Sequence, residues 1–234
     1  QVVLAPGRAD IALSLTDIGE SDVLQSILDV ALHSFDVSVE PPLRVRLFRT
    51  RLGHVLTFVV HHISADGSST VPFARDLVAA YTARVRGHAP VWAPLEVQYA
   101  DYTLWQRDLL GADDDPESVA SKQIDYWTKQ LAGLPEQLEL PTDRPRPSVQ
   151  SFGGAAITFT LDPTMHRDLL ALGKSNGATL FMVMQAALTV LLARTAGTDD
   201  VAIGTPIAGR GEPALDALIG MFVNTLVFRT RVEA

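Results

Sequence analysis

The chain has 234 residues, 47% hydrophobic and 20% charged, so it can bury a substantial core in one large domain or two small ones. Its formal net charge of −8, without a cluster of Lys and Arg, argues against nucleic acid as a partner. The chain contains no cysteine, which excludes disulfides, thiolate metal sites and a cysteine nucleophile and fits a cytoplasmic protein.

Strands and helices are predicted to alternate along the first part of the chain. Residues 43–48 alternate between apolar and polar side chains, as in a half-exposed strand, and residues 55–60 form a β-branched run typical of a buried strand. A helix follows over residues 70–86, where apolar side chains recur at steps of three and four. A second helix is predicted near residues 118–131.

A Pro-rich run at residues 140–147 marks a predicted boundary between two subdomains. The N-terminal subdomain then comprises residues 1–145 and the C-terminal one residues 146–234. The elements predicted in the second are a strand at 155–161, a helix from Asp162-Pro163 to Asn176-Gly177, an apolar helix over 178–193 capped by Thr179 and closed by Gly197, and strands at 201–203 and 222–232. The apolar helix is shorter than the roughly 20 residues of a membrane span, so we expect a core helix and no membrane partner.

The most informative motif runs from His61 to Gly67 and reads His-His-Ile-Ser-Ala-Asp-Gly, directly after the strand predicted at 55–60. A loop at a strand end can hold a proton-transfer group at the mouth of a cleft. Imidazole is the side chain whose unperturbed pKa lies closest to neutral pH, which makes His62 a candidate general base. A lone histidine at a strand end is more often an ordinary hydrogen-bonded residue, so the motif needs support from elsewhere in the sequence.

Three ordered motifs resemble those of the condensation domains of nonribosomal peptide synthetases, members of the chloramphenicol-acetyltransferase-like superfamily. They are the histidine motif extended to Ser69, the segment Tyr-Ala-Asp-Tyr-Thr-Leu-Trp at 99–105, and Ile-Gly-Met-Phe-Val-Asn-Thr at 219–225. Single short patterns recur by chance, but three in the family's order do not. The two motifs that precede the histidine pair in this family are missing and the first residue is Gln1. We therefore expect a piece that is incomplete at both ends.

The resemblance implies an α/β fold, a two-layer sandwich of the chloramphenicol-acetyltransferase-like type with two related subdomains in a V. It also implies that His62 is catalytic, that His61 supports it, and that Asp66 pairs with a distant arginine and fixes the loop. Arg210 is the expected partner and Arg194 the alternative.

Further roles follow from the same resemblance. Gly67 is expected to keep the channel beside the catalytic histidine open because it has no side chain. Ser69 caps the following helix or lines that channel, and Asn224 lies near the crevice between the two halves. No metal is expected, since the acidic run at residues 113–115 lacks the spacing of a calcium loop.

The implied activity is formation of a peptide (amide) bond between a carrier-bound acyl or peptidyl thioester and a carrier-bound aminoacyl acceptor, as in antibiotic biosynthesis. Residues 134–145 most resemble the subtype that joins an L-configured donor to an L-acceptor. Phosphopantetheine belongs to the partner carrier domains, so no cofactor is expected on the chain itself. The implied partners are an upstream donor carrier, a downstream acceptor carrier and an adjacent adenylation domain.

Three alternative functions remain open at this point. An epimerization domain shares the fold and the histidine pair but is expected to lack the Phe-Val-Asn-Thr pattern at 222–225. Stand-alone acyltransferases also carry His-x-x-x-Asp, although the motifs containing Tyr99 and Asn224 argue against them. An inactive module that only docks carrier domains is the non-enzymatic alternative, and the intact His62 argues against it.

Overall fold

The structure is a computed structural model that describes residues 11–233. These residues form both strands and helices, which confirms the predicted α/β class. They group into two compact units: one holds the described residues up to Leu110 together with Ile207–Asn224, and the other holds Gly111–Pro206 and the residues from Thr225 onward. The units therefore alternate along the chain and do not follow the boundary at residue 145. The division into subdomains at that boundary stays a prediction.

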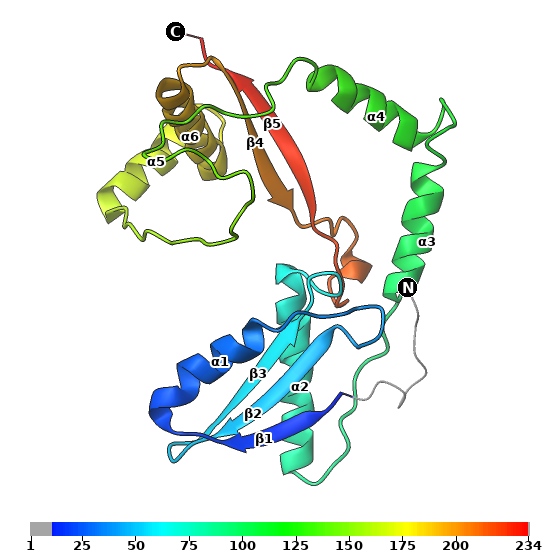
Figure 1. The fold of residues 1–234 in the computed structure, drawn as a ribbon. Helices are drawn as coiled ribbons and strands as arrows, with labels where there is room; N and C mark the ends of the chain where they lie inside the picture. Colours follow the sequence, from blue (N-terminus) through cyan, green and yellow to red (C-terminus); the bar gives the residue numbers. More distant parts are fainter. Residues whose placement is uncertain (1–10, 234) are drawn as a thin grey trace. The chain divides into compact units, whose positions relative to one another are not determined.

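The first unit is built on a three-stranded sheet (Figure 1). Its elements are β1 (Leu13–Asp17), η1 (Glu20–Asp22), α1 (Val23–Ala31), β2 (Leu43–Arg49), β3 (His54–Val60), η2 (Gly67–Ser69), α2 (Thr70–Val85), α3 (Tyr99–Leu110) and η3 (Pro213–Leu215). The strands lie in the order β1-β2-β3, with β1 parallel to β2 and β3 antiparallel to it. Both strands predicted in this part of the sequence are confirmed.

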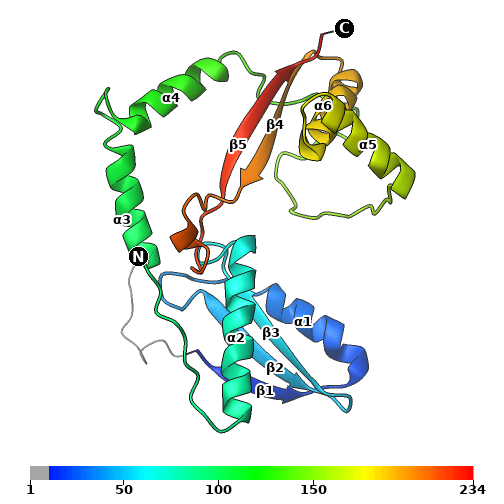
Figure 2. The same cartoon turned by 180° about the vertical axis from the view of Figure 1, so that it is seen from behind.

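The central strand β2 is covered on both faces of the sheet. Val45 and Phe48 are 8% and 5% exposed, and an odd spacing along a strand places their side chains on opposite faces. Helix α2 packs on one face, where the ring of Phe73 meets that of Phe58 edge to face at 4.8 Å. Figure 2 shows α2 in front of this sheet. The end of β3 and the start of α2 are thereby held together, and the loop between them carries the histidine pair.

The second unit contains the remaining helices and nearly all of a two-stranded sheet. Its elements are α4 (Val119–Gln130), α5 (Pro163–Ser175), α6 (Leu180–Ala196), β4 (Asp200–Ile207) and β5 (Asn224–Arg231), of which Ile207 and Asn224 belong to the first unit. The guanidinium of Arg229 on β5 bonds the carboxylate of Asp200 on β4 at 2.6 Å. It also donates to the carbonyl oxygens of Gln130 and Ala132, which ties the sheet to the end of α4.

The predicted helix boundaries in the second unit follow local capping chemistry. The carboxylate of Asp162 accepts hydrogen bonds from the backbone N–H groups of Thr164 and Met165, and the hydroxyl of Thr179 accepts one from Met182. Gly197 ends α6 in the left-handed conformation, with φ of +66°. No single helix in residues 11–233 is long and apolar enough to cross a membrane; α5 and α6 together reach that length and composition, but they meet at a bend of 101°.

The strand predicted at residues 155–161 is wrong. This segment has no regular structure, and Ile157 and Phe159 are 91% and 75% exposed. An apolar alternating run becomes a strand only where a neighbouring strand satisfies its backbone groups, and the sequence pattern names no such neighbour. The last predicted strand is confirmed from Asn224 onward, and the one predicted at 201–203 extends over the whole of β4.

The N-terminal cap of α5 can be tested by mutation. Replacing Asp162 with Ala removes an acceptor from two N–H groups at the helix start, and we expect a loss of about 1 kcal/mol in the free energy of unfolding. Asp162→Asn keeps a capping oxygen and should cost much less. Urea unfolding of the two variants measures the difference, and equal losses would argue against the cap.

Candidate functional site

The histidine loop, residues His61–Ser69, joins β3 to α2 in the first unit. The backbone N–H of His61 donates to the carbonyl oxygen of Pro42 at 2.9 Å, which continues the pairing of β2 with β3 by one residue. The Nδ1 atom of the same ring accepts a hydrogen bond from the backbone N–H of Ile63 at 3.1 Å. These two hydrogen bonds fix the start of the loop, and the supporting role of His61 stays a prediction.

His62 is exposed and borders a cavity of about 670 Å³ in the first unit. Within residues 11–233, none of the hydrogen bonds or ion pairs is made by its imidazole ring, so both ring nitrogens are available to a ligand. Seven apolar side chains contribute to the cavity wall: Pro42, Leu43, Phe58, Val60, Ala65, Phe73 and Ile219. The ring thus stands at an open, largely apolar cavity, where a proton acceptor could meet a bound substrate.

Asp66 is a fully buried carboxylate with donors on both oxygens. Its Oδ1 accepts hydrogen bonds from the backbone N–H and the hydroxyl of Ser69, each at 2.9 Å, and from Arg210 Nη2 at 3.2 Å. Its Oδ2 accepts one from the backbone N–H of Phe222 at 3.0 Å. Burial by itself raises the pKa of Asp66, but these donors outweigh it and lower the pKa to about 2. The group is an ionised anchor at neutral pH.

Arg210, the partner expected for this carboxylate, is 6% exposed and bonded in several directions. Its Nη1 donates to the carbonyl oxygens of Leu215 at 2.5 Å and Leu218 at 3.0 Å. Its guanidinium carbon lies 4.0 Å from the centre of the Phe222 ring, within range of a cation–π contact. Arg194, the alternative partner, is exposed on α6 in the second unit.

Ser69 links the histidine loop to the return loop, which we define as Gly209–Phe222. Its hydroxyl accepts hydrogen bonds from Arg210 Nη2 at 3.0 Å and from the backbone N–H of Gly220 at 3.1 Å. Together with Asp66 it forms a reciprocal capping box at η2. Ser69 also borders the cavity, but it is 2% exposed and its hydroxyl is already occupied.

The return loop packs against the motif at residues 99–105, an arrangement that the sequence alone did not indicate. The hydroxyl of Tyr99 donates to the carbonyl oxygen of Met221 at 2.6 Å, and burial raises the pKa of Tyr99, which keeps it protonated. The Phe222 ring packs against Tyr99 and Tyr102, with centres 5.1 and 4.7 Å away. The sequence does contain one signal for a tightly packed turn here. A large aromatic residue, Phe222, follows Gly220 by two positions.

The two other residues implied by the resemblance lie at exposed positions. Gly67 is the first residue of η2, and no heavy atom lies within 4 Å of where its Cβ would be. Asn224 is the first residue of β5 and is exposed. The structure does not bring Asn224 into the wall of the cavity beside His62.

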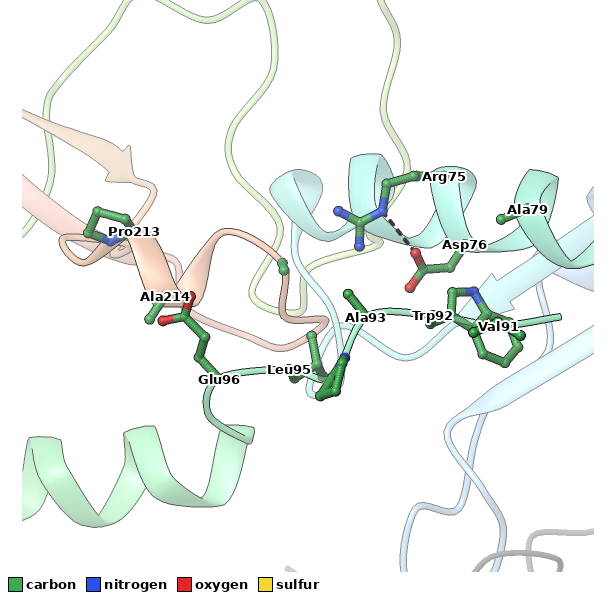
Figure 3. Close-up of a pocket in the computed structure, with 12 residues that line it drawn as sticks. Arg75, Asp76, Ala79, Val91, Trp92, Ala93, Leu95, Glu96, Pro213 and Ala214 are labelled. Carbon is green, nitrogen blue, oxygen red and sulfur yellow. Dashed lines mark hydrogen bonds and ion pairs between the residues drawn. The ribbon is translucent and has the colours of Figure 1, made fainter.

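A second cavity in the first unit, of about 620 Å³, has a different character (Figure 3). It lies between α2, residues 91–96 and η3, and Arg75 and Asp76 form an ion pair at its edge. No histidine is among its lining residues. Across residues 11–233, no group of three or more His, Asp or Glu side chains is placed to hold a metal ion. The cavity beside His62 is therefore the stronger candidate for acid–base chemistry.

Comparison with known proteins matches the whole chain to one family. That family is described as Condensation domain, and the match covers residues 1–234. The isonitrile lipopeptide synthase of Mycobacterium tuberculosis is 48% identical over 236 residues, which cover 99% of this chain and 9% of that protein. The dimodular nonribosomal peptide synthase of Bacillus subtilis is 46% identical over 231 residues, which cover 98% of this chain and 10% of that protein. The chain spans a tenth or less of the length of these curated relatives.

Solved structures show the same likeness in three dimensions. The X-domain from teicoplanin biosynthesis is 35% identical, with a TM-score of 0.88 over 95% of this chain and 50% of that chain. The epimerization domain from the third module of tyrocidine synthetase B has a TM-score of 0.77 over 96% of this chain and 52% of that chain. At 20% identity this is a likeness of fold alone. The predicted chloramphenicol-acetyltransferase-like α/β fold is confirmed.

Two glycines near the histidine loop should respond oppositely to alanine. A Cβ on Gly220 would overlap the ring of Tyr99, so Gly220→Ala should lower the free energy of unfolding by about 1–3 kcal/mol. A Cβ on Gly67 enters open space, so Gly67→Ala should change it by less than about 0.5 kcal/mol. Denaturant unfolding checks both, and a stable Gly220→Ala variant would contradict the packing described here.

The low pKa of Asp66 predicts an acid-sensitive fold. Its pKa is 3.8 before folding perturbs it and about 2 in the folded protein, so the ionised group stabilises the fold fully above pH 4. Because each pKa unit is worth about 1.4 kcal/mol, about 2 kcal/mol is lost as pH falls from about 4 to 2.

Asp66→Asn is the matched control for this pH dependence, since it keeps the shape of the side chain but cannot ionise. We expect it to be less stable than the parent at pH 7 and to lack this part of the fall below pH 4. Unfolding free energies measured from pH 7 to pH 2 decide the matter. Parallel curves for the two proteins would show that the carboxylate is not held in the way described.

Proposed function

Because the chain belongs to the condensation-domain family of nonribosomal peptide synthetases, we propose that it forms an amide bond between a carrier-bound acyl or peptidyl thioester and a carrier-bound aminoacyl acceptor. The observation that carries this proposal is the unengaged imidazole of His62 at a cavity, on a loop anchored by a buried carboxylate. The donor and the acceptor are proposed to be L-configured.

His62 is proposed to serve the proton transfers of this reaction. The amine nitrogen attacks the thioester carbonyl, the tetrahedral intermediate expels the thiolate, and the nitrogen loses a proton. An α-amino group with a pKa of about 7.7–8.0 is already roughly a tenth neutral at pH 7, so removing its first proton gains only about one order of magnitude. Positioning contributes more, since effective molarities reach about 10⁵–10⁸ M. His62 therefore orients the amine and accepts the proton of the intermediate.

The remaining site residues are proposed to support this histidine. Asp66 and Arg210 have side chains 0% and 6% exposed, so they act through the position of the loop and do not touch substrate. Gly67 leaves the passage beside the loop open, and Asn224 contributes to the substrate path. Ser69 fastens the loop, since its hydroxyl is used internally.

Substrates are proposed to arrive on phosphopantetheine arms of an upstream donor carrier and a downstream acceptor carrier, with an adenylation domain adjacent. The cofactor then belongs to the partners. The Phe-Val-Asn-Thr sequence at 222–225 favours condensation over epimerization within this fold.

Removing the imidazole tests the proposal. In a full-length protein that contains this chain, His62→Ala should lower the condensation rate with carrier-bound substrates by about 10²–10⁴-fold. His54→Ala, at the exposed start of β3, is the matched control and should retain activity. Near-normal peptide formation by His62→Ala eliminates the role.

The protein without substitution distinguishes the alternative functions in the same assay. Inversion of an aminoacyl centre without peptide formation would identify an epimerase, and binding of carriers without turnover would identify a docking module.

A further inference from the structure

The cavity beside His62 offers an apolar surface that the chemistry at the imidazole does not use. Phe58 and Val60 of β3 and Phe73 of α2 line it, with the Phe58 and Phe73 rings packed edge to face, and Leu43 and Ile219 add to the apolar wall. Its volume of about 670 Å³ lies in the range of small-molecule sites. A cavity of this size holds more than the reacting amine and carbonyl groups.

The polar groups in the same wall are mostly committed elsewhere. The carboxylate of Asp66 is 0% exposed and accepts four hydrogen bonds from within the first unit, and the hydroxyl of Ser69 is bonded to Arg210 and Gly220. Among the polar lining side chains, those of His62, Ser64 and Thr70 remain to meet a guest. A charged or amide side chain placed against the rings of Phe58 and Phe73 would give up water there, which costs free energy that an aliphatic or aromatic side chain does not lose.

The group nearest this surface follows from the reaction itself. The proposed function puts the acceptor amine in hydrogen-bond contact with the imidazole of His62. The acceptor side chain branches from the carbon bonded to that nitrogen, whereas the donor side chain is separated from it by the carbonyl carbon as well. Of the two side chains, that of the acceptor is therefore held closer to His62 and to the cavity that this ring borders.

We infer that this cavity receives the acceptor side chain and selects aliphatic or aromatic amino acids over charged or amide-bearing ones. The inference rests on the proposed function and adds the substrate class. Val60 is the most informative wall residue, because it is 39% exposed at the end of β3 and can be changed with little disturbance of packing. Its partner across the ladder, Leu43, also lines the cavity.

The experiment uses a full-length protein that contains this chain, a fixed donor, and acceptor carriers loaded with preformed aminoacyl-phosphopantetheine, which bypasses any earlier selection of the amino acid. Leucyl and phenylalanyl acceptors should give kcat/KM values at least about tenfold above asparaginyl and glutamyl ones. Val60→Thr, nearly isosteric but polar, should reduce this ratio several-fold. Val78→Thr, the same change at a residue 63% exposed on α2 and outside the wall, should leave it unchanged.

Val60→Ile provides a second variant that stays apolar and fills space. It should shift the preference from phenylalanyl toward smaller apolar acceptors. Equal rates with all acceptors, or a preference that follows the donor side chain, overturn the inference while peptide formation leaves the proposed function standing. No peptide with any acceptor overturns the proposed function, and the inference with it. The unfolding midpoint of each variant establishes that the changes in rate do not come from loss of folded protein.

Discussion

The buried carboxylate of Asp66 is the constraint on which the site depends. A charge removed from water is tolerated only when it is paired and hydrogen-bonded, and here every partner outside the histidine loop comes from the return loop, some 150 residues further along the chain. The histidine loop therefore cannot take its position until Arg210 and Phe222 are in theirs. Presentation of His62 is coupled in this way to the folding of the whole first unit.

The same network assigns different chemical roles to two neighbouring titratable side chains. His62 and Asp66 both border the cavity, but the carboxylate is surrounded by donors and the imidazole has no internal partner within residues 11–233. A base whose lone pair is already shared with an arginine and two backbone N–H groups has little capacity to accept a proton from substrate. The proton-transfer role is consequently proposed for the histidine, and the aspartate is proposed to fix the loop that carries it.

The sequence predicted what local chemistry decides. The caps at Asp162 and Thr179 act within one helical turn, and the loop after β3 follows from an apolar run that meets polar residues. Where a contact or a strand depends on a partner far away in the sequence, its prediction relied on the family resemblance or failed. The pairing of Asp66 with Arg210 could not be derived from spacing, and residues 155–161 have the pattern of a strand without a strand to pair with.

Helix α2 shows the same limit within a single element. Its apolar stripe of Val71, Ala74, Val78, Tyr81 and Val85 correctly indicated a helix. Val71 and Tyr81 are nevertheless 74% and 71% exposed, while Pro72 is buried and Phe73 meets the sheet. Periodicity establishes that a helix has an apolar stripe, but the face that packs is chosen by the complementary surface. Phe73 lies one step beside the obvious stripe, and it is this residue that faces the cavity next to His62. The residues to which we assign substrate choice are thus the ones that a pattern along the chain describes least.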